Sequence, residues 1–207
     1  PAENRKALAI DPRFIMAYQN IGSEEAFSLS HPGAALSAFR QTLSLFNHVD
    51  GQMSAQARAI LQINTSANVA YLIGDFQTAV AQYAVTASLP DYAFIVETAR
   101  MQRADCLALL HDFGGAHDAW ANIPVASGLN SAATSYPAIR IESDAALQDW
   151  SSVLADRASA EPALAALAAK IPPIKPGMDV ELARQIRPFA ALALAERGDR
   201  SGAERLI

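Results

Sequence analysis

Apolar residues along the chain recur mostly three and four positions apart, which is the spacing of one face of an α-helix. Residues 13–29 carry this pattern and predict a first helix. His31-Pro32-Gly33 interrupts it, and the same spacing resumes from Ala35 to Phe46, which predicts a second helix. Two helices joined by so short a break form a helical hairpin.

The same arrangement returns further along the chain and predicts a series of hairpins. They occupy residues 13–46, 54–89, 92–123 and 136–157, preceded by a partial helix at 3–11. Ser54 is the predicted N-cap of a long helix that ends near Ile73, because its hydroxyl can accept a hydrogen bond from the first helical turn. The repeats therefore fill residues 1–157.

The pattern is lost from residue 158 to 177, where the segment ends in Ile171-Pro172-Pro173-Ile174-Lys175-Pro176-Gly177. Proline at this density favours an extended connector, so we predict an irregular linker over 158–177. A further, truncated hairpin follows at 178–207, with Pro188 either kinking or starting its first helix.

The predicted turns share a motif with an aspartate at its centre. The motifs are Gly74-Asp75-Phe76, His111-Asp112-Phe113, Gln148-Asp149-Trp150 and Gly198-Asp199-Arg200. The first three aspartates are 37 residues apart, and the fourth follows after 50 residues. A unit of this length that recurs along a chain indicates a solenoid of stacked repeats.

Composition supports an all-α fold, because hydrophobic residues make up 51% of the chain and aromatic residues only 7%, with alanine and leucine most abundant. The net charge of −5 and the lack of a Lys/Arg cluster argue against a nucleic-acid partner. No apolar run approaches the roughly 18–20 residues that span a bilayer, so we expect no membrane insertion.

A single cysteine, Cys106, excludes an internal disulfide and fits a reducing compartment. We therefore expect a cytoplasmic location, although an exported protein without disulfides would have the same composition. The chain opens without methionine, inside a predicted helix, which indicates a fragment of a longer protein.

The second helix of most hairpins carries a small residue followed four positions later by a large one. These pairs are Ala35 and Phe39, Ala79 and Tyr83, Ala116 and Trp120, a weaker Val153 and Arg157, and Ala203 and Ile207. With Tyr18-Gln19-Asn20-Ile21-Gly22 in a first helix, they resemble the tetratricopeptide repeat (TPR). The resemblance implies a right-handed α-α superhelix of about five hairpins. The repeats here are longer than the usual 34 residues, and Ala67 and Ala104 replace the glycine of Gly22.

In this family the first helix of each pair lines the concave face and binds peptides. The positions that the resemblance assigns to this groove are Gln19, Ser23, Asn64, Asn68, Met101, Asp105 and Glu142. An asparagine side chain offers both a donor and an acceptor to a peptide backbone. The alternative is a polar helix face that only contacts solvent. Because these positions hold no lysine, we expect a basic or neutral ligand rather than a carboxylate.

Cys106, His111 and His117, with Asp112 and Asp118, form the cluster that most suggests a metal site or a nucleophile. The repeat pattern explains it more simply, because Asp112 is a turn residue and Cys106 is a small apolar residue within a helix. No glycine-rich phosphate loop is present. We therefore expect neither a cofactor, nor a metal, nor enzymatic activity.

The leading hypothesis is a non-catalytic scaffold that binds a protein or peptide on the concave face of the repeats. The alternative is a regulatory or sensory domain of a larger signalling protein that binds a small molecule or forms a homo-oligomer. It rests on a looser resemblance of the first repeat, the loop, the long helix and the Gly74-Asp75 turn to repeat regions of bacterial kinases, cyclases and transcription regulators. Neither hypothesis names the partner.

Overall fold

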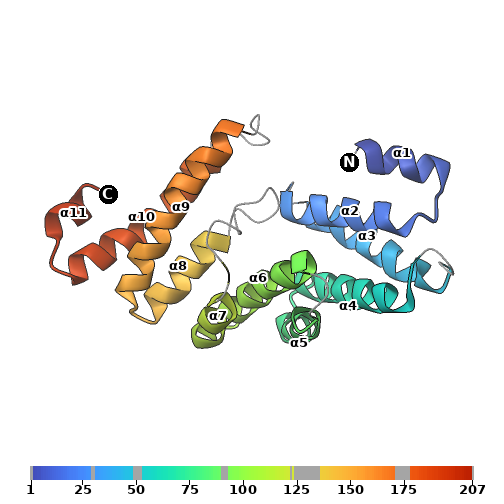
Figure 1. Ribbon diagram of the computed structural model, residues 1–207, viewed down its shortest axis with the longest axis horizontal. Helices are drawn as coiled ribbons and strands as arrows, with labels where there is room; N and C mark the ends of the chain where they lie inside the picture. The colour runs from blue at the N-terminus through green and yellow to red at the C-terminus, as the bar shows by residue number, and fades with distance from the viewer. Residues whose placement is uncertain are drawn as a thin grey trace. The chain divides into compact units, whose positions relative to one another are not determined.

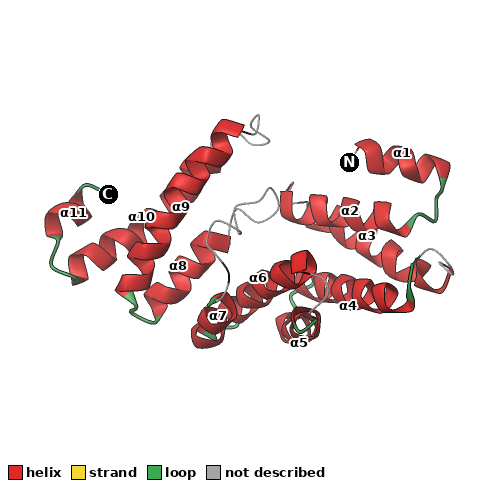
Figure 2. Ribbon diagram, viewed as in Figure 1, coloured by secondary structure: helices red, strands yellow, loops and turns green. Residues whose placement is uncertain are grey.

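The computed structural model describes residues 2–28, 31–48, 53–89, 93–121, 123, 136–170 and 178–206. Within these residues the protein consists of helices, turns and loops and contains no strand (Figure 2). The prediction of an all-α chain is therefore confirmed. Residues cluster into two compact units, Pro1–Cys106 and Leu107–Ile207, and each is described by itself.

The first unit contains successive helices that pack against their neighbours (Figure 1). They are α1 (Ala2–Ile10), α2 (Ile15–Ser23) with a π-helical turn (Glu24–Ser28), α3 (Pro32–Leu45) with a 3-10 turn (Phe46–His48), α4 (Ala55–Leu72), α5 (Phe76–Ala87) and α6 (Ala93–Leu109). The predicted break at His31-Pro32 is the start of α3, where proline fits the first helical turn. Ser54 caps α4 as predicted, since its Oγ accepts a hydrogen bond from the Ala57 N–H at 3.1 Å.

The second unit contains α7 (Phe113–Trp120), α8 (Tyr136–Ala146), α9 (Trp150–Lys170), α10 (Met178–Glu196) and α11 (Arg200–Glu204). Helix α10 packs against both α8 and α9 and also contacts α11. The sequence predicts a connector from 158, but α9 continues to Lys170. Alanine and leucine are the strongest helix formers, and their density after Pro162 favours continuing the helix despite the proline within it. The proline-rich residues 171–177 lie outside the described residues.

The division into units falls within the run of repeats predicted for residues 1–157. The boundary between Cys106 and Leu107 lies within α6, whereas the sequence predicts an uninterrupted run of repeats to residue 157. Pro188, predicted to kink or start a helix, lies in the interior of α10.

One backbone turn recurs at all four predicted aspartate motifs. The residues before the aspartates are left-handed, with φ of 82° at Gly74, 60° at His111, 58° at Gln148 and 86° at Gly198. Each aspartate N–H donates at 2.9 Å to the carbonyl oxygen five residues earlier, and the residue before it donates to the carbonyl three residues earlier. These two backbone hydrogen bonds together form the Schellman motif, which ends a helix.

Each of the four aspartates then caps the next helix. Its carboxylate accepts from the N–H three residues later at 2.8–3.2 Å, and these donors are Thr78, Gly115, Ser152 and Gly202. The same short segment thus satisfies the last carbonyls of one helix and the first N–H groups of the next. The regular spacing of the four aspartates in the sequence therefore reflects the recurrence of this turn.

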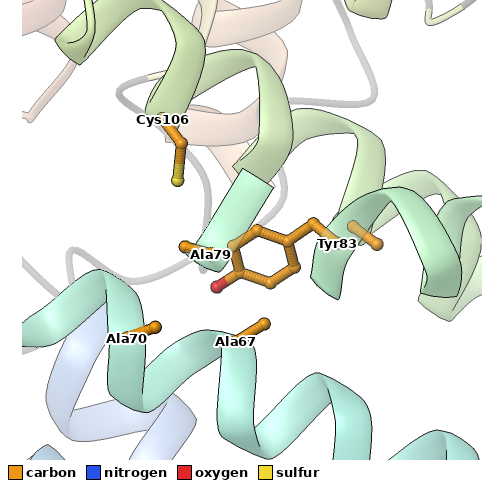
Figure 3. Close-up of a cluster of buried hydrophobic side chains, with 6 residues drawn as sticks. Ala67, Ala70, Ala79, Tyr83 and Cys106 are labelled. Carbon is orange, nitrogen blue, oxygen red and sulfur yellow. The ribbon is translucent and has the colours of Figure 1, made fainter. Parts of the chain in front are cut away.

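The small and large residues of the repeat pattern meet in the cores. Ala79, Tyr83, Ala35, Phe39 and Ala116 are all fully buried. In the first unit the Tyr83 ring of α5 lies beside Ala67 and Ala70 of α4, while Ala99 and Cys106 extend the cluster onto α6 (Figure 3). Small side chains on α4 leave the space that the tyrosine fills.

The core of the second unit joins three helices. Ile141 and Ala145 of α8, Val153 of α9, and Ile186 and Ala193 of α10 form one buried cluster. Helix α10 therefore covers the apolar surface that the α8–α9 hairpin presents.

Candidate functional site

Several predicted groove residues lie between neighbouring helices of the first unit and form hydrogen bonds from one helix to the other. Gln19 of α2 accepts a hydrogen bond from the Thr65 hydroxyl of α4 at 2.8 Å. Asn68 Oδ1 accepts from the Tyr83 hydroxyl at 2.6 Å and from the Gln102 amide at 3.3 Å. These side chains are buried, so their hydrogen bonds link α2 to α4 and α4 to α5 and α6.

Asp105 of α6 is the third such residue. Its Oδ2 accepts a hydrogen bond at 2.7 Å from the hydroxyl of Tyr71 on α4. Burial raises the pKa of Tyr71, and the neighbouring Asp105 carboxylate raises it further. Tyr71 therefore remains a protonated donor, and this bond links α4 to α6.

Asp105 also acts on Cys106. Burial raises the pKa of the Cys106 thiol to about 12, and the charge of Asp105 adds to the shift. The thiol is fully buried within the α4–α6 core. A buried thiol that stays protonated at neutral pH is a poor nucleophile, so this environment does not favour cysteine chemistry.

The remaining predicted residues differ in accessibility. Met101 is buried in α6, Ser23 and Asn64 are partly buried, and Glu142 of α8 is exposed in the second unit. Ser23, Asn64 and Glu142 are therefore the members of the predicted set with accessible surface. Asn64 lies on α4 in the first unit, four residues before Asn68, whereas Glu142 lies in the second unit.

Buried acceptor oxygens without a hydrogen-bond partner among the described residues lie on α4, α5, α6 and α8, and three of them are on α4 and α6. They include Asn64 Oδ1, Glu97 Oε1 and Gln102 Oε1. Asn64 lies one helical turn before Asn68, to which Gln102 is bonded. Oxygens of this kind can accept hydrogen bonds from backbone N–H groups or from basic side chains.

Sequence reasoning missed Glu97 and Gln102. Gln102 had a usable signal, because it precedes Asp105 by three positions and so shares its helix face. For Glu97 we find no comparable signal, since acidic residues on helices are usually solvated.

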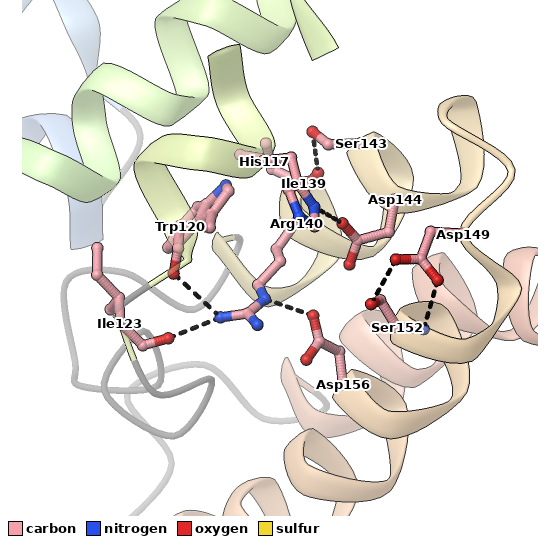
Figure 4. Close-up of polar contacts among 10 residues, drawn as sticks. All are labelled: His117, Trp120, Ile123, Ile139, Arg140, Ser143, Asp144, Asp149, Ser152 and Asp156. Atoms are coloured by element: carbon pink, nitrogen blue, oxygen red, sulfur yellow. Dashed lines mark hydrogen bonds and ion pairs between the residues drawn. The ribbon is translucent and has the colours of Figure 1, made fainter. Parts of the chain in front are cut away.

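The second unit contains a separate polar cluster that joins α7, α8 and α9 (Figure 4). His117 Nδ1 and the buried Asp144 Oδ1 are 2.6 Å apart. Arg140 pairs with Asp156 and donates to the Ile123 carbonyl oxygen at 2.6 Å. Burial raises the pKa of Asp156 to about 6. The neighbouring Arg140 lowers this pKa, and the Asp144 carboxylate raises it.

Cys106, His111 and His117, which lie close together in the sequence, have different surroundings in the structure. His117 lies with Asp144, His111 occupies the left-handed turn position with its ring against Phe113, and Cys106 is in the core of the first unit. Asp112 caps α7. In the described part of the chain, no three His, Cys, Asp or Glu side chains are grouped so that they could hold a metal ion.

No helix among the described residues combines the length and apolar character needed to span a bilayer. Comparison with family models, curated proteins and solved structures gives no match to this chain.

Proposed function

We propose that the protein is a non-catalytic scaffold of TPR-like helical hairpins that binds a peptide or protein segment. The observation that carries this proposal is the recurrence of one capped turn at Asp75, Asp112, Asp149 and Asp199. Each turn joins two helices, and stacked hairpins of this kind form extended binding surfaces. Such surfaces bind by complementarity and need no catalytic group.

The α4 and α6 faces of the first unit are the proposed contact region. Asn64 and Glu97 are partly buried and Gln102 is buried, and each holds a buried acceptor oxygen with no partner among the described residues. If the partly exposed side chains of Asn64 and Glu97 turn outward on binding, a bound peptide would supply backbone N–H groups or a basic side chain to their oxygens. Asn68 and Asp105 would contribute by holding α4 and α6 together rather than by contacting the ligand.

Binding can be tested with peptides selected from a random display library on the immobilised protein. Their affinities are then measured by fluorescence anisotropy for Asn64→Ala and for Gln62→Ala, which removes the same amide from an exposed position of α4. Loss of one hydrogen bond of about 1 kcal/mol should weaken binding about fivefold for Asn64→Ala only.

Circular dichroism of both variants controls for folding. Failure to select any peptide, or equal affinities for the two variants, would contradict the proposed contact region.

A further inference from the structure

The polar cluster of the second unit encloses two carboxyl groups between α7, α8 and α9 (Figure 4). Asp144 of α8 is 1% exposed and Asp156 of α9 is 7% exposed. Arg140 pairs with Asp156, and His117 Nδ1 lies 2.6 Å from Asp144 Oδ1. The cluster thus combines two acidic groups, one permanent cation and one imidazole that is charged only when protonated.

The charges of this cluster balance only when it holds one proton. With both carboxylates ionised and the imidazole neutral, the single guanidinium leaves a net negative charge where water scarcely reaches. A net charge in a buried place is costly, so groups there take up or release protons until the charges balance. The proton has two possible places, the imidazole of His117 and the carboxyl pair.

Asp144 Oδ2 favours the carboxyl pair. This oxygen is buried and has no hydrogen-bond donor among the described residues. The carboxyl group of Asp156 lies within hydrogen-bonding reach of Asp144, but it cannot donate while it is ionised. A protonated Asp156 can donate to Asp144 while its other oxygen accepts from Arg140. The proton therefore satisfies an acceptor that otherwise has no partner.

The other charged groups near Asp156 are occupied elsewhere. Helix α10 packs against α8 and α9 through apolar side chains, and its Arg184 and Arg187 line a surface groove with α11. The charged groups on the helices around Asp156 are Arg140 and Asp144 on α8, His117 on α7, and Asp149, Arg157 and Glu161 on α9 itself. Of the groups on α9, Asp149 caps the helix and Arg157 pairs with Glu161 at 2.8 Å.

Helix α7 is the element that this cluster attaches. His117 lies in its last turn, and Arg140 donates to the carbonyl oxygens of Trp120 at 3.5 Å and Ile123 at 2.6 Å. In contrast, α8, α9 and α10 are joined by an apolar cluster that contains no charged residue. Departure of α7 would let water reach the carboxyl groups, so the surroundings that favour a protonated Asp156 exist while α7 is attached.

The pKa of Asp156 agrees with this arrangement. Burial raises this pKa from 3.8 to about 6; Arg140 opposes the shift and Asp144 adds to it. A carboxyl group with a raised pKa in the attached form binds its proton more tightly there, so protonation favours attachment. This stabilisation is fully present below about pH 4 and is lost as the pH rises through 6.

We propose that Asp144 and Asp156 share a proton that latches α7 onto α8 and α9, and that loss of this proton loosens α7. Loosening exposes the face of α7 that carries the buried Ala116 and Trp120. The latch is a pH-sensitive device of the second unit. It makes no use of the α4 and α6 contact region, so the two proposals can fail separately.

Amide hydrogen exchange of the full chain, followed by mass spectrometry, measures how often α7 opens. Division by the intrinsic exchange rate at each pH gives a protection factor. With a pKa of about 6 in the attached form and 3.8 in the released form, protection of α7 should fall about tenfold from pH 5 to pH 7.5. At each pH, α7 should also be less protected than α8 and α9, because it opens while they stay packed.

Three variants locate the proton. Asp156→Asn mimics the protonated carboxyl group, because its amide nitrogen can donate to Asp144 and its oxygen can accept from Arg140. The change in α7 protection should shrink to less than about twofold. His117→Gln removes the titrating imidazole but keeps a donor for Asp144, and it should retain the pH dependence. Asp118→Asn is the matched control, since it removes an exposed carboxylate of α7 and should leave the profile unchanged.

Three results would overturn the proposal. An undiminished tenfold change in Asp156→Asn would show that another group titrates. Loss of the change in His117→Gln would place the proton on the imidazole. Equal protection of α7, α8 and α9 at every pH would show that α7 opens only when the whole unit unfolds.

Circular dichroism at pH 5 checks that each variant folds. Should Asp156→Asn not fold, NMR of carboxyl-labelled aspartates in the unchanged protein tests the same point. One aspartate carboxyl should titrate near pH 6, and a protein in which all of them titrate below about pH 4.5 would refute the shared proton.

Discussion

Replacing Gln148 by glycine should stabilise the protein, because Gln148 holds a left-handed backbone conformation with φ of 58°. A non-glycine residue there costs about 1–2 kcal/mol, whereas glycine adopts this region freely. Glycine also loses about 0.5–1 kcal/mol more conformational entropy on folding. The net gain should be about 0.5–1 kcal/mol, or roughly 2–4 °C in Tm.

The free energy of unfolding can be measured by urea denaturation followed by circular dichroism. Gln148→Ala is the matched control, because it removes the side chain but keeps the strained Cβ, and it should leave stability nearly unchanged. The reverse change, Gly198→Ala at φ of 86°, should cost about 1 kcal/mol through the backbone alone, since nothing lies within 4 Å of the added Cβ. A Gln148→Gly protein less stable than Gln148→Ala would refute the reasoning.

Three further predictions concern packing, pH and reactivity. Gly22→Ala should destabilise by about 1–3 kcal/mol in urea, because the new Cβ would lie 2.6 Å from the Phe39 ring, whereas Gly33→Ala meets open space and should not destabilise. Asp156 has a pKa raised from 3.8 to about 6. The stability that its protonated form contributes to the folded state is therefore fully present below about pH 4 and is lost as the pH rises through 6. The urea midpoint of the second unit should fall over this range, and a variant Asp156→Asn with an equally steep fall would contradict the assignment. Cys106, with its pKa raised to about 12, should react with a disulfide reagent at about pH 8 at least a hundredfold more slowly in native than in urea-unfolded protein, and equal rates would exclude its burial.

The helices and their turns could be predicted because their causes are local. The hydrophobic spacing in residues 13–46 and the Ser54 cap depend on neighbours within one or two helical turns. The same is true of the Gly74-Asp75 turn, whose donors and acceptors lie within five residues. The interpretation of residues 158–170 as a connector was wrong because the loss of the repeat pattern and the proline-rich residues 171–177 were given more weight than the helix propensity of the alanines and leucines in this segment.

The candidate sites required the tertiary structure. Gln19, Asn68 and Asp105 are polar positions on helix faces, and the sequence cannot say whether such a face meets solvent or another helix. Their partners Thr65, Gln102 and Tyr71 lie 34 to 46 residues away. The same holds for the pairing of His117 with Asp144, which are 27 residues apart.

The sequence by itself therefore determined the all-α class, most helix boundaries and the four capped turns, since short-range hydrogen bonding and hydrophobic spacing suffice for each. The tertiary structure alone decided which polar side chains are buried between helices and which remain accessible, such as Glu142. Burial depends on which distant segment packs over a residue, and no local pattern contains that information.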